Sequence, residues 1–458
     1  MGATEQLARF VVDTKLQDIP QEAVERANIT FLDIIGVALA GTVVEETGQM
    51  AIRFTRDIGG TAEATVIGGG FRTSAPNAAL VNGLLAHALD FDDWELTGGH
   101  PSSMLVAACL ALGEKHGLAG SALIEAYIIG LEVYDRLSTG CPGAQNRGWH
   151  GAAVFGTMGA TAAGAKLLGL TVPETIMAFG IAASSASGLA RQHGNMTKPV
   201  QIGKAARNGV EAALLAKYGF TSDDAIIENP KGFCDAYLGE GICDCAKMIQ
   251  NLGNPLHILS PGVGIKFYPC RYPEFRMIDA VLALRKEHGF TYDDVERVEI
   301  HASPHKLKTT ILEPETGLQG KFSTKYICAR ALLDGEITLS TFSDEKVREE
   351  KTKEALQKIF LIPDPTIPEK WLKARSPVTV RLKNKQVFSR EVDIPKGDPR
   401  NPLPLDEVIA KYCSNASLVL AEQEVAYSSN LLQQFDQLED LQELLSILRL
   451  RPDNAEGS

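Results

Sequence analysis

Helical segments whose apolar side chains recur every three or four residues dominate the first part of the chain. The pattern covers residues 23–41, 102–117 and 121–137. Such spacing is typical of helices, and segments this apolar need other helices to bury them. We therefore expect a large all-helical domain over residues 1–265.

One of these segments is rich in small residues. Glycine and alanine fill most positions of residues 152–169, AAVFGTMGATAAGAKLLG. Because the distance between two packed helices depends on the side chains at their contact, small residues let neighbours approach closely. The longest uncharged stretch, residues 148–165, overlaps this segment, whereas a membrane span needs about 20 strongly apolar residues. We expect a core helix here and no membrane partner.

The pattern changes after about residue 265. Residues 295–302 and 377–395 alternate apolar with polar or charged side chains, which is typical of half-exposed strands. The second of these segments predicts two strands that join at Asn384 and Lys385.

Helical segments lie between the expected strands, at residues 325–335 and 349–360. We expect a smaller α+β domain over residues 266–403, and C-terminal helices over residues 404–458 that return to the helical domain. The expected fold class is mainly α, with a large all-helical domain and a smaller α+β lid domain.

The charge balance restricts the partners. The chain has 45 Lys and Arg against 57 Asp and Glu, a net charge of −12. Nucleic acids and anionic membranes attract basic surfaces, so we expect neither as a partner. An acidic chain that binds an anion must gather its cations locally.

The eight cysteines are scattered, and no CxxC pair occurs. Only Cys243 and Cys245 are close neighbours in the sequence. This spacing does not indicate a zinc or iron–sulfur site, and we expect no such metal centre. Reduced thiols and the absence of a signal-peptide pattern at the N-terminus favour a cytoplasmic location.

An acidic stretch follows directly on an apolar helical run. Residues 89–103, LDFDDWELTGGHPSS, come immediately after ALVNGLLAHA. The acidic residues and the histidine of this stretch are Asp90, Asp92, Asp93, Glu95 and His100. No metal-ligand spacing accounts for them, which makes them candidates for proton transfer.

Basic residues and a second histidine gather in other short stretches. They are Lys198, Lys204 and Arg207 in MTKPVQIGKAARNG, Lys266, Arg271 and Arg276 at the domain boundary, and His150 at the start of the small-residue helix. Cations of this kind can hold a small polycarboxylate while a histidine or aspartate moves a proton on the carbon beside a carboxylate. Removal of that proton builds charge on the carboxylate, which fixed Lys or Arg groups stabilise.

Each residue also has a purely structural interpretation. A histidine at a helix start, such as His100 or His150, is often a cap or a hydrogen-bonded core residue, and clustered aspartates often form a solvated turn. Lys198, which precedes Pro199, is most simply a lysine in a loop. The IGGG at residues 67–70 lacks the spacing and the βαβ setting of a nucleotide-binding loop.

Several motifs occur together and in order: AHALDFDDWELTGGHPSS, GWHGAAVFGTMGATAAGAKLLG, MTKPVQIGKAARNG, KFYPC, KFSTKYICARALLDGEITL and PKGDPRNPL. In this combination the chain resembles the MmgE/PrpD family over nearly its whole length. Members of that family include 2-methylcitrate dehydratase, cis-aconitate decarboxylase and iminodisuccinate epimerase. The resemblance implies a helical domain, a smaller α+β lid domain, a homodimer, and a cofactor-independent site in the cleft between domains.

The resemblance also implies roles for individual residues. Asp90 matches the first aspartate of the family's aspartate-rich motif, and His100 matches the histidine of its HP motif. His150 matches the histidine before the buried helix. These three are the implied catalytic residues, with His100 the favoured proton-transfer group. The implied substrate-binding residues are Lys198, Lys266, Arg271, Trp94, Gln201 and Arg207.

The chain departs from the family pattern at three positions. Trp94 stands where dehydratases and decarboxylases usually carry threonine, and Gln201 replaces the usual histidine after TKP. Phe275 stands where a histidine is common, with Arg271 as a nearby cation. These departures argue against a standard methylcitrate or cis-aconitate substrate and indicate a site retuned for a smaller or less charged acid.

Three functions remain open from the sequence. The first is a lyase that dehydrates or decarboxylates a small di- or tricarboxylic acid. The second is an epimerase or isomerase acting at the same type of carbon, because GWH, MTKP and AARNG resemble iminodisuccinate epimerase. The third is a non-catalytic relative, against which the joint presence of the implied histidines, aspartate and lysines counts.

Overall fold

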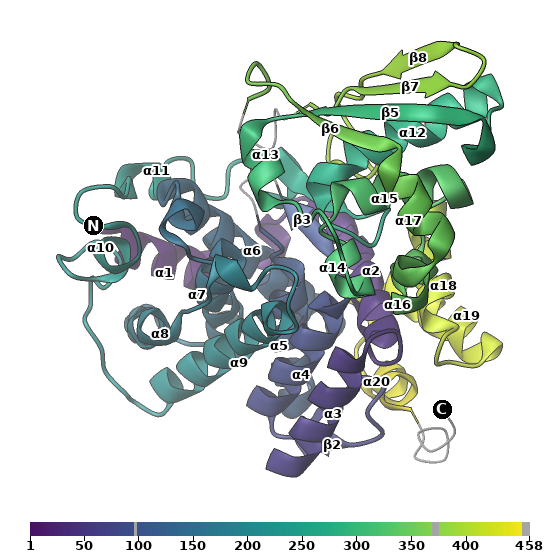
Figure 1. Ribbon diagram of the computed structural model, residues 1–458. Coiled ribbons are helices and arrows are strands. Elements are labelled where there is room, and N and C mark those ends of the chain that lie inside the picture. The colour runs from purple at the N-terminus through teal and green to yellow at the C-terminus, as the bar shows by residue number, and fades with distance from the viewer. Residues whose placement is uncertain (96–98, 369–374, 451–458) are drawn as a thin grey trace. The chain divides into compact units, whose positions relative to one another are not determined.

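The structure is a computed structural model that describes residues 1–95, 99–368 and 375–450 (Figure 1). The chain forms two compact units. The first comprises Met1–Gln192, Met196–Ile265 and Pro404–Ser458, and the second comprises His193–Asn195 and Lys266–Leu403.

The first unit is built mainly of helices. They are α1 (Ala3–Asp13), α2 (Gln21–Gly41), α3 (Glu46–Ile58), α4 (Ala75–Ala88), α5 (Ser102–His116), α6 (Gly120–Gly140), α7 (Gly151–Leu167), α8 (Val172–Ser185), α9 (Thr197–Lys217), α10 (Phe233–Leu238), α11 (Cys245–Ile249), α18 (Leu405–Ala416), α19 (Glu422–Gln433) and α20 (Gln442–Arg449). Two antiparallel strand pairs accompany them: β1 (Ala64–Thr65) with β2 (Arg72–Thr73), and β3 (Asp93–Glu95) with β4 (Val263–Ile265).

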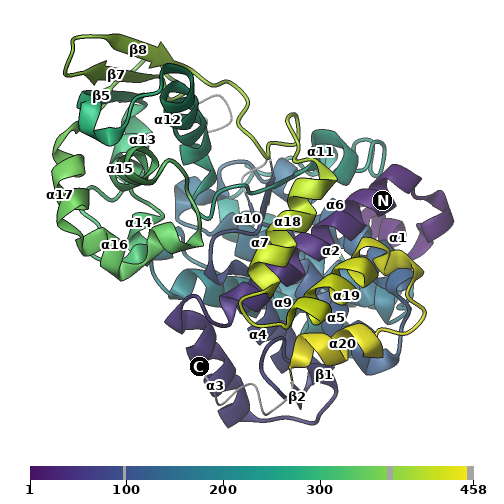
Figure 2. The ribbon, with the colours of Figure 1, turned by 90° about the vertical axis from the view of Figure 1, so that its right-hand side faces the viewer.

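Helix α7 lies at the centre of this unit and packs against α5, α6, α8 and α9. Its side chains are buried from Gly151 to Ala165, as expected of a helix that is apolar on all sides. Helix α4 packs against α9, α5 and α2, and the C-terminal helices α18 and α19 lie on α2 (Figure 2). The helices expected at residues 23–41, 102–117, 121–137 and 152–169 are confirmed as α2, α5, α6 and α7.

Two glycines set the distance between α6 and α7. A Cβ added at Gly159 would lie 2.8 Å from the carbonyl oxygen of Gly130, and one added at Gly130 would lie 2.7 Å from the carbonyl oxygen of Gly159. Both distances are shorter than carbon–oxygen contact allows, so this approach of the two backbones requires glycine on both helices.

The second unit contains a four-stranded mixed sheet in the order β6-β5-β7-β8. The strands are β5 (Val295–Ala302), β6 (Ile359–Pro363), β7 (Val378–Leu382) and β8 (Val387–Arg390), and the helices are α12 (Phe275–His288), α13 (Pro304–Thr309), α14 (Gly317–Gly320), α15 (Thr324–Asp334), α16 (Asp344–Arg348) and α17 (Glu350–Gln357). Strand β5 is parallel to β6 and antiparallel to β7, with Val298 opposite Ile359 and Val380. Helices α12 and α15 pack together and against strands of this sheet, whose side chains Val298 and Val380 are fully buried.

The strands expected at residues 295–302 and 377–395 are confirmed as β5, β7 and β8, and Lys385 takes a left-handed conformation in the turn between β7 and β8 (φ 71°). The single helix expected over residues 349–360 is wrong, because α17 ends at Gln357 and β6 begins at Ile359. The apolar residues at the end of this segment pair with β5 instead of completing a helical turn. The expected fold class is confirmed: mainly α, with a mixed α+β second unit.

Among the described residues, no single helix has both the length and the apolar character to cross a membrane.

The close approach of α6 and α7 predicts that Gly159→Ala lowers the free energy of unfolding by about 1–3 kcal/mol, because the new methyl group meets backbone that cannot rotate away. Gly156→Ala in the same helix is the matched control, since its added methyl group meets only the flexible side chain of Met104. Urea unfolding of both variants measures the difference. Equal stability of the two variants would contradict this explanation of α6–α7 packing.

Candidate active site

The acidic stretch after α4 turns into the interior of the first unit. Helix α4 ends at Ala88, and Asp90 adopts a left-handed conformation with φ 51°. Such a conformation is uncommon for a residue with a side chain and marks a turn held by its surroundings. Asp90, Asp92 and Asp93 are all buried, each at most 3% exposed. The aspartates therefore do not form a solvated surface turn.

Lys198 supplies the positive charge that faces Asp90. Its Nζ lies 2.7 Å from Oδ1 of Asp90, and both side chains are only 5% exposed. Lys198 is in the first turn of α9, so the packing of α9 on α4 brings the two groups together. A buried ion pair loses hydration on both partners, and removal of one partner leaves a charge that the interior does not solvate.

His87 and Asp92 form a second buried pair. Nδ1 of His87 lies 2.6 Å from Oδ2 of Asp92, and the Ser103 hydroxyl donates to the same oxygen at 2.7 Å. Since the carboxylate accepts, Nδ1 of His87 carries the proton. Burial lowers the pKa of His87 even though Asp92 opposes this shift. The ring is therefore neutral at neutral pH, with a lone pair on Nε2.

His100 is held by the backbone. Its Nδ1 lies 2.7 Å from the carbonyl oxygen of Asp93, and because a carbonyl only accepts, Nδ1 is the donor. When the ring is neutral, the lone pair is then on Nε2, which lies 3.9 Å from Oδ1 of Asp90. The side chain of His100 is 18% exposed, so it retains access from outside. This combination suits a group that exchanges a proton with a bound molecule.

His150 is oriented by Gln201. The Gln201 side-chain nitrogen donates to the carbonyl oxygen of Leu189 at 3.2 Å, which fixes the orientation of the amide. Its oxygen then accepts from Nδ1 of His150 at 2.7 Å. His150 is the N-cap residue of α7 and is 4% exposed. The centroid of its ring lies 6.4 Å from that of His87, whose ring is 4.8 Å from that of His100.

Asp93 links the site to the start of α5. Its carboxylate accepts from the backbone nitrogen of Ser102 at 3.1 Å and from the Ser102 hydroxyl at 2.5 Å. The N-terminus of α5 is thus capped by a residue from outside the helix, and not by the side chains of its own serines. Burial raises the pKa of Asp93 well above its usual range, and the neighbouring Asp92 adds to the increase.

Together these residues form a cluster of three histidines with Asp90, Asp92 and Lys198. An imidazole whose Nδ1 is fixed as donor can, when neutral, accept a proton through Nε2, and a lysine can stabilise negative charge beside it. His87, Asp90, Asp92 and His100 each offer one donor atom within 4.8 Å of the others, a set that could also hold a metal ion. Lys198 already supplies a positive charge to Asp90, so this carboxylate does not need a metal ion to balance its charge.

The structure does not bring every expected site residue into this cluster. Arg207 follows Lys198 by nine residues in α9, which at about 100° per residue places it on the opposite side of the helix. It pairs with Glu211 at 2.7 Å and lines a groove of about 650 Å³ between α3, α4 and α9. The expectation that Arg207 binds substrate at this cluster therefore does not fit its position.

Trp94, Lys266 and Arg271 have different settings. Trp94 is buried in β3, where it pairs with Gly264, and adjacent strand residues point to opposite faces, so it points away from the face of Asp93. Lys266 is the first residue after β4 and begins the second unit. In that unit Arg271 lies 2.6 Å from Glu274, which also pairs with Lys306 at 2.9 Å.

His87 and Ser103 were not recognised from the sequence. His87 belongs to the apolar run ALVNGLLAHA, whose pattern indicates core. The available indication was a histidine inside an otherwise apolar helix, followed five residues later by Asp92. A buried histidine needs a polar partner, and an aspartate at the end of the same helix supplies one.

The depressed pKa of His87 predicts a contribution to pH dependence. Below the unfolded-state pKa, about 6.5, the unfolded chain binds a proton that folded His87 does not, so stability falls as pH decreases, by at most about 1.4 kcal/mol per pH unit. Urea unfolding between pH 5 and 8 should show a smaller decrease for His87→Gln than for the wild type. His305→Gln, at an exposed histidine, should keep the wild-type slope, and parallel curves for all three proteins would refute the prediction.

Comparisons with known proteins agree with the architecture. Residues 5–244 match the MmgE/PrpD N-terminal domain, and residues 268–437 match the MmgE/PrpD C-terminal domain. The chain is 28% identical to a cis-aconitate decarboxylase of Mus musculus, over 98% of this chain and 93% of that protein. It is 26% identical to a cis-aconitate decarboxylase of Homo sapiens over 97% and 94%, and 27% identical to one of Aspergillus terreus over 98% and 96%. The chain belongs to the MmgE/PrpD family.

Proposed function

We propose that this protein is a cofactor-independent lyase that decarboxylates a small tricarboxylic acid. The observation that carries the proposal is the position of His100, whose Nε2 faces the buried Asp90–Lys198 pair. The chain surrounding this arrangement is similar over nearly its full length to cis-aconitate decarboxylases from mouse, human and a fungus.

Decarboxylation of such an acid needs a group that stabilises negative charge and a group that donates a proton. The bond between a carboxylate carbon and its neighbour breaks, the electron pair stays on the neighbouring carbon, and carbon dioxide leaves. The remaining carboxylates and the double bond of an unsaturated acid delocalise that pair, and a proton then closes the reaction. His100 is the proposed proton donor: because its Nδ1 is fixed on the carbonyl oxygen of Asp93, the protonated ring would release its proton from Nε2. Lys198 stabilises the negative charge that remains on the substrate.

The departures from the family pattern are compatible with this chemistry. Gln201 stands at a position where relatives usually have histidine, and it orients His150 through a hydrogen bond of 2.7 Å. Gln201 therefore replaces one hydrogen-bonding side chain with another, and His150 and His100 remain as the histidines proposed for proton transfer. We propose that substrate selection, and not the proton-transfer step, is where this chain differs from its relatives.

The proposed decarboxylation predicts a measurable role for His100. Proton NMR in D₂O should show cis-aconitate, or a smaller unsaturated acid from a panel of di- and tricarboxylates, losing a carboxylate and gaining deuterium. His100→Gln should lower turnover by about 10²–10⁴-fold, and His305→Gln should leave it unchanged. Deuterium exchange without a change of the carbon skeleton would indicate an epimerase and contradict the proposed lyase. Silence of the folded wild type across the panel would support a non-catalytic relative.

A further prediction distinguishes the effect of the Asp90–Lys198 charges on substrate binding from their effect on stability. Lys198→Met alone leaves the Asp90 carboxylate buried without its cation and should cost about 3–5 kcal/mol of stability. The double variant Asp90→Asn/Lys198→Met removes both charges, so it should recover most of that stability while substrate affinity stays low. Urea unfolding and steady-state kinetics of both variants test this. If the double variant kept the wild-type KM and kcat, the Asp90–Lys198 pair would have no part in substrate binding or catalysis.

A further inference from the structure

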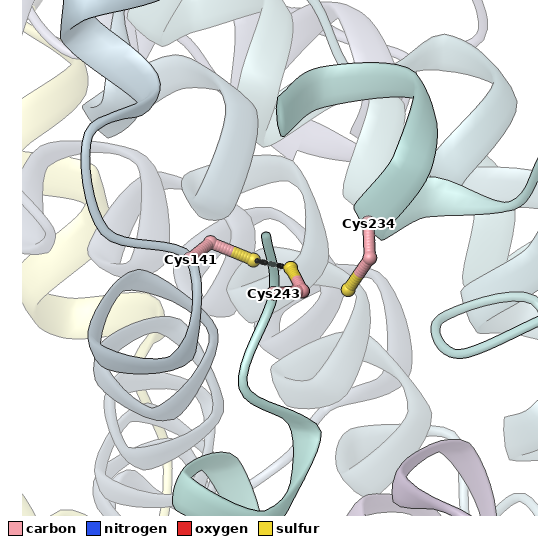
Figure 3. Close-up of side chains that lie close together, drawn as sticks. All are labelled: Cys141, Cys234 and Cys243. Carbon is pink, nitrogen blue, oxygen red and sulfur yellow. Dashed lines mark hydrogen bonds between the residues drawn. The ribbon is translucent and has the colours of Figure 1, made fainter. Parts of the chain in front are cut away.

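Four cysteines from separate segments converge at one end of the first unit. Cys141 follows the last residue of α6, Cys234 lies in the first turn of α10, and Cys243 and Cys245 flank Asp244 at the start of α11. The Sγ atoms of Cys141, Cys234 and Cys243 all lie within 4.8 Å of one another. Figure 3 shows the thiols of Cys141 and Cys243, 2.8 Å apart, with the sulfur of Cys234 beside them.

The backbone holds these segments together independently of the thiols. The nitrogen of Asp244 donates to the carbonyl oxygen of Gly140 at 2.9 Å, which fixes the loop of Cys243 against the end of α6. The nitrogen of Cys234 donates to the carbonyl oxygen of Ile227 at 3.2 Å. The first of these bonds joins the loop of Cys243 to the end of α6 beside Cys141, and the second fixes the backbone of Cys234 to the segment before α10.

The charges around the thiols favour a cation. Cys141 and Cys234 are buried, whereas Cys243 is partly exposed. Carboxylate residues directly follow two of the cysteines in the sequence: Asp235 follows Cys234, and Asp244 follows Cys243. A cysteine used as a nucleophile usually lies in electropositive surroundings, whereas thiolates among carboxylates attract a positive ion.

We propose that Cys141, Cys234 and Cys243 bind a soft divalent cation, zinc in the first instance, as a structural site that joins the end of α6 to α10 and α11. Sulfur donors select soft or borderline ions. Tetrahedral zinc binds thiolates at about 2.3 Å, which corresponds to sulfur–sulfur distances of about 3.8 Å, within the span of these three atoms. Cys245, two residues after Cys243, is a candidate for a fourth ligand.

The expectation of no metal rested on sequence spacing alone. The first ligand is separated from the other cysteines by more than 90 positions, so no local motif connects them. The site is also independent of the histidine cluster, whose donor set contains His87, Asp90, Asp92 and His100 and no cysteine.

The test uses the full-length protein, purified without a histidine tag and with a reducing agent. Elemental analysis should find about one zinc per chain, and replacement by Co²⁺ should give the absorption of tetrahedral thiolate coordination. Cys243→Ser should lose the bound ion and the cobalt spectrum. Cys413→Ser, at a partly exposed cysteine in α18, is the matched control and should keep both.

A second measurement covers the case in which Cys243→Ser does not fold. In the wild type, zinc should protect Cys141, Cys234 and Cys243 from alkylation, and a chelator should expose them together, as read by mass spectrometry of peptides. Three results would overturn the proposal: no metal and no cobalt spectrum, a Cys141–Cys243 disulfide in the reduced preparation, or an ion that survives Cys243→Ser and is lost in His100→Gln.

Discussion

Burial of several carboxylates inside an apolar helical unit is the constraint on which the site depends. Asp90, Asp92 and Asp93 are buried, each at most 3% exposed, and a buried carboxyl group needs a cation or hydrogen bonds. The fold supplies a different partner for each: Lys198 from α9 for Asp90, His87 from α4 for Asp92, and the N-terminus of α5 for Asp93. Three helices are thereby fixed against one short loop.

These partnerships also decide which atoms can do chemistry. Each histidine of the cluster hydrogen-bonds through Nδ1 to an oxygen, from Asp92, from the backbone or from Gln201. A neutral imidazole held in this way has its lone pair on Nε2. His87 is fully enclosed while His100 remains partly exposed, so the same tautomer has a structural role in one residue and is available to a substrate in the other.

Much of this fold follows from local sequence, and most of the site does not. Periodicity alone predicts α2, α5, α6 and β5, because each buries one face or its whole surface. It fails at β6, where Ile359 continues the apolar pattern of a helix but pairs with β5. Arg207 could have been excluded from the sequence, since a nine-residue separation from Lys198 reverses the helix face. The convergence of the cysteines depends on which helices meet, and no local pattern contains that information. His87 differs, because its partner Asp92 follows it by five residues in the sequence.

The position of Gln201 bears on whether the chain is an enzyme. A relative that had lost catalysis would have no need to hold His150 through an amide that is itself fixed by the carbonyl oxygen of Leu189. The chain combines these hydrogen bonds with the partly exposed His100 and the buried Asp90–Lys198 pair, although the pair and the left-handed Asp90 both carry an energetic cost. Strain and buried charge persist where they serve a reaction. Without such a role, apolar residues in place of the ion pair would stabilise the unit. The arrangement of these groups therefore argues for proton transfer in this protein and against a role in assembly alone.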